Sequence, residues 1–231
     1  MTQRLNYQKE LRDLHERMIR MGSDVEEAIH TAVQSLIDID VNLAKRVITN
    51  DDAIDDQERE INQECIMLIA RQQPVASDLR EITSDMKLTT DLERMADHAE
   101  DIADHVIAIS KLAHKVIVPH DIVQLASQTQ NMIHAAIDAY VSADADKAKQ
   151  VILMDSNIDN LYANMKEYLV KQMKLDPESA DIYVEMLLIC KHLERIGDHS
   201  ENVAEWIIYH IEGEYASSSE IRREVKDEDK G

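Results

Sequence analysis

The chain repeats itself. Residues 91–103 (DLERMADHAEDIA) and 192–204 (HLERIGDHSENVA) agree at seven of thirteen positions, 101 residues apart. Residues 44–55 (AKRVITNDDAID) match 148–159 (AKQVILMDSNID) at an offset of 104. Offsets that agree along the chain are hard to obtain by chance, and they limit the fold to two copies of one unit. We therefore predict two tandem repeats followed by a polar flexible tail, with boundaries at 5–114, 115–213 and 214–231.

Each repeat carries the pattern of three helices. In the first repeat, apolar residues step by three and four positions from Leu11 to Leu36, which is typical of one apolar helix stripe. A second helix is expected from about 42 to 73, ending before Pro74, because the residue before a proline is pushed out of the helical region. Ser77 or Asp78 is expected to cap a third helix that runs to about 114. The sequence thus predicts an all-α fold of two pseudo-symmetric three-helix bundles.

Composition supports long helices and excludes several classes of partner. Only 4 Gly and 3 Pro occur in 231 residues, so few positions favour turns. The formal net charge of −21 repels nucleic acid and anionic membrane surfaces. No apolar run approaches the roughly 20 residues of a membrane-spanning helix, and the N-terminal residues lack the apolar segment of a signal peptide. Cys65 and Cys190 lie in apolar helical runs and are expected to be buried thiols, so we expect a cytoplasmic protein.

The second helix of each repeat places a carboxylate on its apolar line. Asp51 and Asp155 hold equivalent positions, and Asp55 and Asp159 follow one turn later on the same face. A carboxylate on a core-facing line costs several kcal/mol to desolvate unless a cation or a donor compensates it. The competing interpretation is that acidic residues are favoured in the N-terminal turn of a helix, or that the end of the apolar stripe simply meets water.

The third helix of each repeat adds further acids. Glu93 and Asp97 flank the apolar stripe in the first copy, and Glu194 and Asp198 do so in the second. Alone, either helix would have an ordinary solvated face. Facing pairs on two neighbouring helices, present twice, instead predict oxygen-only cages for a hard cation such as Mg²⁺, Mn²⁺, Ca²⁺ or iron. Zinc fits poorly because no Cys or His joins at ligand spacing, and His98, next to Asp97, is expected to face away.

Three segments resemble the PhoU family of bacterial phosphate-signalling regulators. They are LERIGDHSENVAEWI (193–207), its first copy LERMADHAEDIADHV (92–106), and RQQPVASDLREI (71–82). The resemblance implies a cytoplasmic protein of two three-helix bundles with metal clusters bound by E/D-x-x-x-D motifs. Asp101 and Asn202 would extend the third-helix motifs by one turn. Carried over position by position, the implied metal ligands are Asp51, Asp55, Glu93, Asp97, Asp101, Asp155, Asp159, Glu194, Asp198 and Asn202.

The resemblance also implies a role. It is negative regulation of the phosphate-starvation response, achieved by linking the ATPase subunit of the phosphate-specific ABC transporter to a sensor histidine kinase and by restraining phosphate uptake. We expect a homodimer that associates peripherally with membrane proteins and binds no nucleic acid. Two alternatives stay open: a carboxylate-bridged metalloenzyme of the phosphatase or oxidase type, and a helical scaffold whose acids only keep it in solution. The first has no general base or nucleophile beyond the ligands, and the second leaves the repeat-matched Asp51 and Asp155 unexplained, so we predict an adaptor that is not an enzyme.

Overall fold

The computed structural model describes residues 2–112 and 116–228, and within them the chain is helical and has no strand. This confirms the predicted all-α fold. In chain order the elements are α1 (Thr2–Asp38), α2 (Val41–Gln72), α3 (Ala76–Leu112), α4 (His120–Ser142), α5 (Ala145–Leu175), the 3₁₀ turn η1 (Pro177–Ser179), α6 (Ala180–Glu212) and α7 (Ser218–Glu228).

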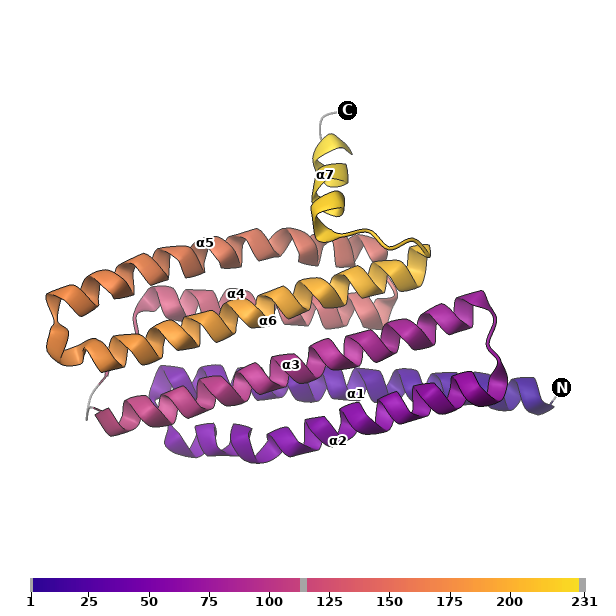
Figure 1. Cartoon of the computed structure of the whole chain (residues 1–231), viewed down its shortest axis with the longest axis horizontal. Helices are drawn as coiled ribbons and strands as arrows, with labels where there is room; N and C mark the ends of the chain where they lie inside the picture. Colours follow the sequence, from indigo (N-terminus) through magenta and orange to yellow (C-terminus); the bar gives the residue numbers. More distant parts are fainter. Residues whose placement is uncertain (1, 113–115, 229–231) are drawn as a thin grey trace.

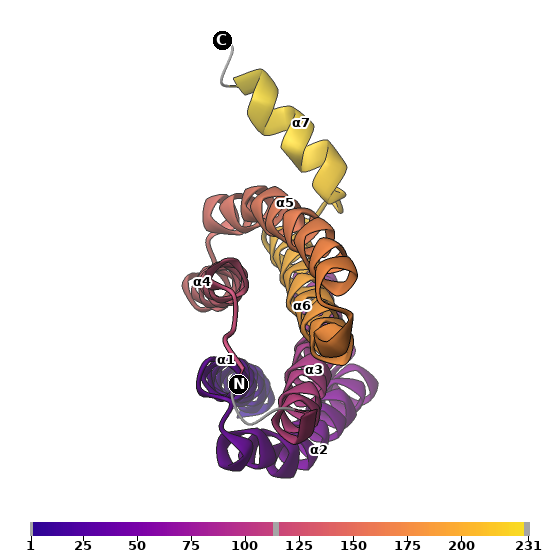
Figure 2. The ribbon, with the colours of Figure 1, turned by 90° about the vertical axis from the view of Figure 1, so that its left-hand side faces the viewer.

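The six long helices form two three-helix bundles that lie side by side (Figure 1). Helices α1, α2 and α3 make the first bundle, and α4, α5 and α6 make the second. Viewed end-on, α2, α3, α6 and α5 follow one another in a curved row, with α1 and α4 covering one side of it (Figure 2). The bundles meet mainly through α3 and α6, with a second contact between α1 and α4. The predicted pair of pseudo-symmetric bundles is therefore confirmed; the boundary expected between residues 114 and 115 lies outside the described residues.

The core is aliphatic, and it follows the spacing seen in the sequence. On α1 the predicted stripe is buried, with Met21, Val25, Ile29 and Leu36 all fully inaccessible to solvent. Such alternation of three and four residues places side chains on one helix face, which then packs against the neighbouring helices. Cys65 and Cys190 are buried free thiols, as expected from their apolar surroundings.

Helices α2 and α5, the second helices of the two repeats, begin with the same kind of cap. The Asp40 carboxylate accepts hydrogen bonds from the backbone N–H groups of the first turn of α2, the shorter from Asn42 at 2.7 Å. Asp144 caps α5 in the same way. The predicted capping of α3 by Ser77 or Asp78 is wrong, because α3 begins at Ala76 and both residues already lie in its first turn. Asp78 still lies at the positive end of the helix dipole, where a carboxylate is favoured.

The segment expected to be a flexible tail, residues 214–231, contains helix α7 (Ser218–Glu228). The start of this helix is held by Glu205 of α6, whose carboxylate accepts a hydrogen bond from the Ser218 backbone N–H at 2.5 Å. Ile221 is only 1% exposed, so α7 buries an apolar anchor. The sequence suggested a loose segment because its composition is polar, but the helix contributes a buried isoleucine and contacts the buried carboxylate of Glu205.

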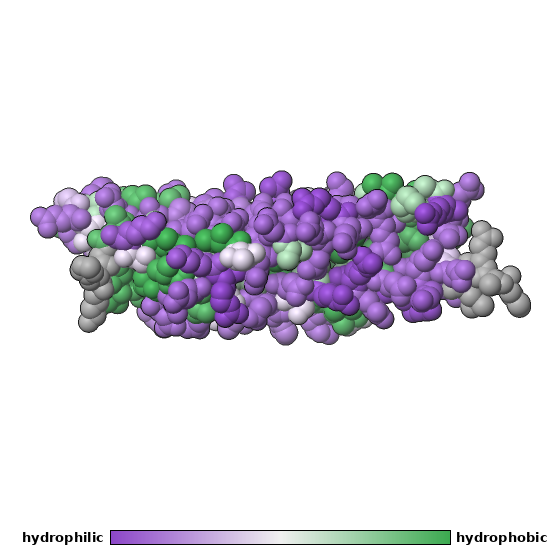
Figure 3. Space-filling view, turned by 90° about the horizontal axis from the view of Figure 1, so that it is seen from below, coloured by the Kyte–Doolittle hydropathy of each residue, from purple (hydrophilic) through white to green (hydrophobic). Residues whose placement is uncertain are grey.

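The outer surface agrees with the charge of the chain. Figure 3 shows one face on which hydrophilic residues predominate, with smaller hydrophobic patches between them. Across residues 2–112 and 116–228, every helix is too short or too polar to cross a lipid bilayer.

The packing of α2 can be tested with two isoleucines on the same helix. Ile61 is 2% exposed and Ile66 is 55% exposed. We expect Ile61→Ala to lower the free energy of unfolding by about 2–5 kcal/mol, because it leaves a cavity in the core. The matched control Ile66→Ala should change it by no more than about 0.5 kcal/mol. Urea denaturation of the two variants measures the difference, and equal losses would contradict the described packing.

Candidate metal centres

The structure brings carboxylates of α2 and α3 together in the first repeat. Asp51 and Asp55 lie one turn apart on α2, and Asp97 reaches them from α3. One carboxylate oxygen of each residue lies within 4.8 Å of the others. All three side chains are partly buried, so the cluster lies in the groove between two helices and keeps access to solvent.

The second repeat builds the same cluster. Asp155 and Asp159 of α5 and Asp198 of α6 each offer an oxygen within 4.8 Å of the others. These residues are the repeat equivalents of Asp51, Asp55 and Asp97, so the duplication produces two copies of one arrangement. Oxygen donors converging from two neighbouring helices are the ligand type that hard cations prefer.

The first cluster carries negative charge that the protein compensates only at Asp97. The pKa of Asp51 is raised to about 7, first by burial and then by the nearby carboxylates of Glu100, Asp55 and Asp97. Arg94 pairs with Asp97 at 3.1 Å, but no Lys or Arg in the described part of the chain forms an ion pair with Asp51 or Asp55. A cation bound among these oxygens would relieve the repulsion, so the site fits a hard metal ion.

The second cluster already has a cation from the protein. The Arg222 guanidinium of α7 donates to Asp155 Oδ2 at 2.8 Å and lies 2.5 Å from Glu201 Oε1. Asp155 is only 4% exposed, and its other oxygen, Oδ1, is buried without a hydrogen-bond partner among the described residues. Burial and the neighbouring Asp159 raise the pKa of Asp155, and Arg222 opposes this shift. An unpaired buried oxygen beside a guanidinium marks a place where positive charge is stabilising.

Glu93 and Glu194 lie at the edge of the clusters rather than among the three converging oxygens. The Glu93 pKa is raised by burial and then by Asp97, which places this carboxyl group within the field of the first cluster. Glu194 forms an ion pair with Lys191, one turn earlier on α6. Both glutamates have long side chains that could swing toward a bound ion.

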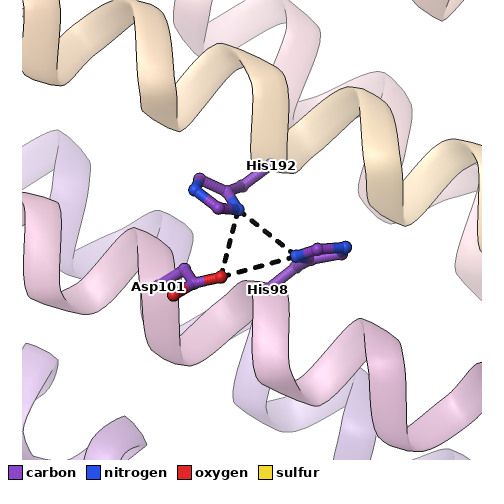
Figure 4. Close-up of side chains that lie close together, drawn as sticks. All are labelled: His98, Asp101 and His192. Atoms are coloured by element: carbon purple, nitrogen blue, oxygen red, sulfur yellow. Dashed lines mark hydrogen bonds and ion pairs between the residues drawn. The ribbon is translucent and has the colours of Figure 1, made fainter.

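Asp101 and Asn202 do not join the clusters in this structure. Asp101 Oδ2 lies 3.3 Å from His192 Nδ1, in the interface between α3 and α6 (Figure 4). The Asn202 amide donates to Asp91 Oδ1 at 3.1 Å in the same interface. Position 101 is four residues after Asp97 but also three after His98, so helical spacing alone could not decide which face it shares. The contact with the opposite bundle decides it.

Sequence reasoning missed two glutamates that belong to the clusters. Glu100 is one of the carboxylates whose charge raises the pKa of Asp51, and Glu201 pairs with Arg222 beside Asp155. Glu100 and Glu201 are repeat equivalents, each three residues after the aspartate of its third helix. That shared spacing was visible in the sequence and places each glutamate on the same helix face as the aspartate.

A duplicated three-helix bundle with one acidic cluster per repeat is the class of protein that this fold and these sites define. The family model described as the PhoU domain matches residues 18–106 and 122–207, one match in each repeat. The chain therefore belongs to the PhoU family.

Curated relatives and solved structures agree with this assignment. The chain is 40% identical over 214 residues to a "Phosphate-specific transport system accessory protein PhoU homolog" of Clostridium acetobutylicum, covering 92% of this chain and 97% of that protein. A protein of the same description from Pseudomonas aeruginosa is 37% identical, and the match covers 90% of this chain and 86% of that protein. The crystal structure of PhoU from Pseudomonas aeruginosa matches with a TM-score of 0.87 at 37% identity, over 90% of this chain and all of that one. The crystal structure of the phosphate transport system regulatory protein PhoU from Streptococcus pneumoniae matches with a TM-score of 0.85 at 29% identity. This match covers 91% of this chain and 99% of that one.

The raised pKa of Asp51 has a consequence for stability. Between about pH 4 and pH 7, the folded metal-free protein holds a proton on Asp51 that the unfolded chain releases, so stability falls as the pH rises through this window. Asp51→Asn should remove this contribution and raise the free energy of unfolding at pH 8 by about 1 kcal/mol, discounted for partial exposure of the carboxyl group. Denaturation at several pH values in chelator measures the difference. The control is Asp52→Asn, which removes the same charge from an exposed neighbour; if both variants have the same pH profile, the cluster does not perturb Asp51.

The role of Arg222 as a built-in cation can be tested in the same way. In chelator, Arg222→Ala should lower the free energy of unfolding by about 1–3 kcal/mol, because it leaves the buried Asp155 without its donor. Arg223→Ala is the matched control, since Arg223 is exposed on the same helix. Added Mn²⁺ should restore the stability of Arg222→Ala and leave Arg223→Ala little changed. Equal stability of the two variants in chelator would contradict this role.

Proposed function

We propose that this chain is a negative regulator of the phosphate-starvation response and a modulator of phosphate uptake. It acts on the cytoplasmic side of the membrane, as a homodimer, by binding the ATPase subunit of the phosphate-specific ABC transporter and a sensor histidine kinase. Its relatives are described as accessory proteins of phosphate-specific transport or, in one crystal structure, as a regulatory protein of that system. Family membership over both repeats is the support for extending this role to the chain.

The observation that carries the metal-binding part of the proposal is the pair of equivalent clusters. Each repeat aims three aspartates from two helices at one point. In the first cluster, Asp51 has its pKa raised to about 7 by burial and by its neighbours, which is costly without a cation. Asp51, Asp55 and Asp97 would hold one hard cation or cluster, and Asp155, Asp159 and Asp198 the other; iron, Mn²⁺, Mg²⁺ and Ca²⁺ all accept such oxygen ligands.

Charge connects the clusters with partner binding. A surface with a net charge of −21 repels acidic segments of other proteins. Cations held in the two grooves lower this repulsion and present positive centres to an anionic ligand or to an acidic segment of a partner. Regulation then proceeds by binding equilibria alone, with no chemical turnover by the protein.

The test combines metal content with repression in cells. Asp51→Ala with Asp55→Ala should lose the metal of one repeat and keep that of the other, measured by elemental analysis of protein purified without chelator. Asp97→Asn with Asp198→Asn, expressed in place of the parent, should derepress alkaline phosphatase in phosphate-rich medium, because both grooves then bind cations more weakly.

The matched control removes the same charge from exposed positions, Asp52→Asn with Asp121→Asn, and should keep repression normal. Circular dichroism establishes that every variant is folded. Normal repression by a folded, metal-free variant lacking Glu93, Asp97, Glu194 and Asp198 would overturn the metal-dependent part of the proposal. The regulatory surface would then lie elsewhere on the bundles.

A further inference from the structure

Four histidines form a row along the interface of α3 and α6. His98 and His105 of α3 alternate with His192 and His199 of α6. The ring centroids are 5.6 Å apart for His199 and His98, and 5.3 Å apart for His98 and His192 and for His192 and His105. On each helix the two histidines are seven residues apart, which is two turns and therefore one face. The row is thus shared by the two repeats.

Within this row, three donor atoms form a compact triangle (Figure 4). His98 Nδ1 and His192 Nδ1 are 3.2 Å apart, and Asp101 Oδ2 lies 3.6 Å from the first and 3.3 Å from the second. A point equidistant from three atoms at these separations lies about 2.0 Å from each of them, which is the length of a Zn–N or Zn–O bond.

We propose that His98, Asp101 and His192 form a binding site for a divalent transition metal ion of the zinc type, separate from the two carboxylate clusters and bridging the two repeats. Two imidazoles and one carboxylate, with a fourth position open to water, are a donor set that zinc accepts and that Mg²⁺ and Ca²⁺ do not favour.

Burial and access suit this site. The side chains of His98 and His192 are 20% and 19% exposed, whereas Asp101 is 51% exposed, so one side of the triangle is open to solvent.

The flanking histidines already have carboxylate partners. His105 Nδ1 lies 2.6 Å from Glu185 Oε2, and His199 Nδ1 lies 2.8 Å from Asp91 Oδ1. These pairs fix the two ends of the row. The middle of the row, in contrast, places two imidazole nitrogens against each other and against one carboxylate.

The duplication supplies an internal comparison. The repeat equivalents of His98, Asp101 and His192 are His199, Asn202 and Asp91, in the same order. At that second place the Asn202 amide donates to Asp91 Oδ1 at 3.1 Å, so a single carboxylate is satisfied by hydrogen bonds. The two places therefore differ at two of three positions: Asp101 corresponds to Asn202, and His192 corresponds to Asp91. These two differences replace a hydrogen-bonded group by the proposed set of metal donors.

A metal ion bound by these three residues would cross-link the two repeats. His98 and Asp101 belong to α3, and His192 belongs to α6, so the ligands come from both bundles. An ion that binds only the folded chain stabilises it, and Zn²⁺ at about 100 times its dissociation constant should raise the melting temperature by roughly 5–10 °C.

The test is a titration of the full chain with Co²⁺, in excess Mg²⁺ to occupy the oxygen-only clusters. We expect one Co²⁺ per chain with the intense visible absorption of a four-coordinate site, displaced by Zn²⁺. The double variant His192→Asp with Asp101→Asn introduces the residue types of the repeat-equivalent positions, Asp91 and Asn202. It should weaken Zn²⁺ binding by about 100-fold or more, beyond the roughly 10–100-fold that loss of an outer partner costs.

Further variants separate the triangle from other histidines. Asp101→Asn alone should also weaken Zn²⁺ binding, and because position 101 is half-exposed this substitution should leave the fold intact. His134→Gln is the control: His134 pairs with Glu26 at 2.8 Å on the surface, and its loss should leave the Co²⁺ spectrum unchanged.

The reverse exchange, Asp91→His with Asn202→Asp, should raise the number of bound Co²⁺ ions from one to two. One ion per chain in that variant counts against the proposed donor set. Absence of the four-coordinate spectrum in the parent, or its persistence after both exchanges at 101 and 192, overturns the proposal and leaves the row as hydrogen-bonded packing.

Discussion

Close packing of α3 against α6 is the contact on which the rest of the structure depends. These two helices lie at the centre of the row seen end-on, so each has one side toward its own bundle and one toward the other (Figure 2). Small residues lie at equivalent positions of the two helices. At Gly197 a Cβ atom would lie only 3.2 Å from Ile158, so this position allows α6 to approach α5 of its own bundle closely. The carboxylate clusters lie where α3 and α6 meet α2 and α5, and the histidine row lies where they meet each other. The buried small residues are Ala96, Ala99 and Ala103 on α3 and Gly197, Ser200 and Ala204 on α6.

Concentrating carboxylates in two grooves creates an electrostatic cost that each repeat meets differently. In the first cluster the cost appears as a proton held by Asp51 near neutral pH. In the second cluster, Arg222 of α7 pairs with Asp155, but burial still raises the pKa of the Asp155 carboxyl group. Neither arrangement gains stability from the acids themselves, since a desolvated carboxylate is costly even when it is paired. This is the physical reason to connect these residues with function rather than with folding.

The sequence predicted the features that follow from periodicity and repetition. The all-α fold and the convergence of Asp51, Asp55 and Asp97 required only helical spacing and the rule that consecutive helices pack together. The orientation of Asp101 could not be predicted, because it depends on His192 of the other bundle, and no local pattern encodes that contact. Docking of α7 depends on single residues, Ile221 and Arg222, in a polar segment. The histidine row left a signal in the sequence, a spacing of seven on both third helices, but its meaning depended on knowing that those helices face each other.

Duplication produces two copies of each site, and a few substitutions then make the copies chemically different. The second cluster lies under a helix that occurs once, after the second repeat, whereas the first has no such cover among the described residues. A cation bound at the second cluster as proposed would compete with Arg222 for Asp155 Oδ2, and its binding would then be coupled to the docking of α7. A partner that displaces α7 would therefore raise the cation affinity of that cluster, and by reciprocity a bound cation would favour that partner. The proposed adaptor would thus have one cluster without a covering helix and a second cluster whose cation affinity depends on what binds α7.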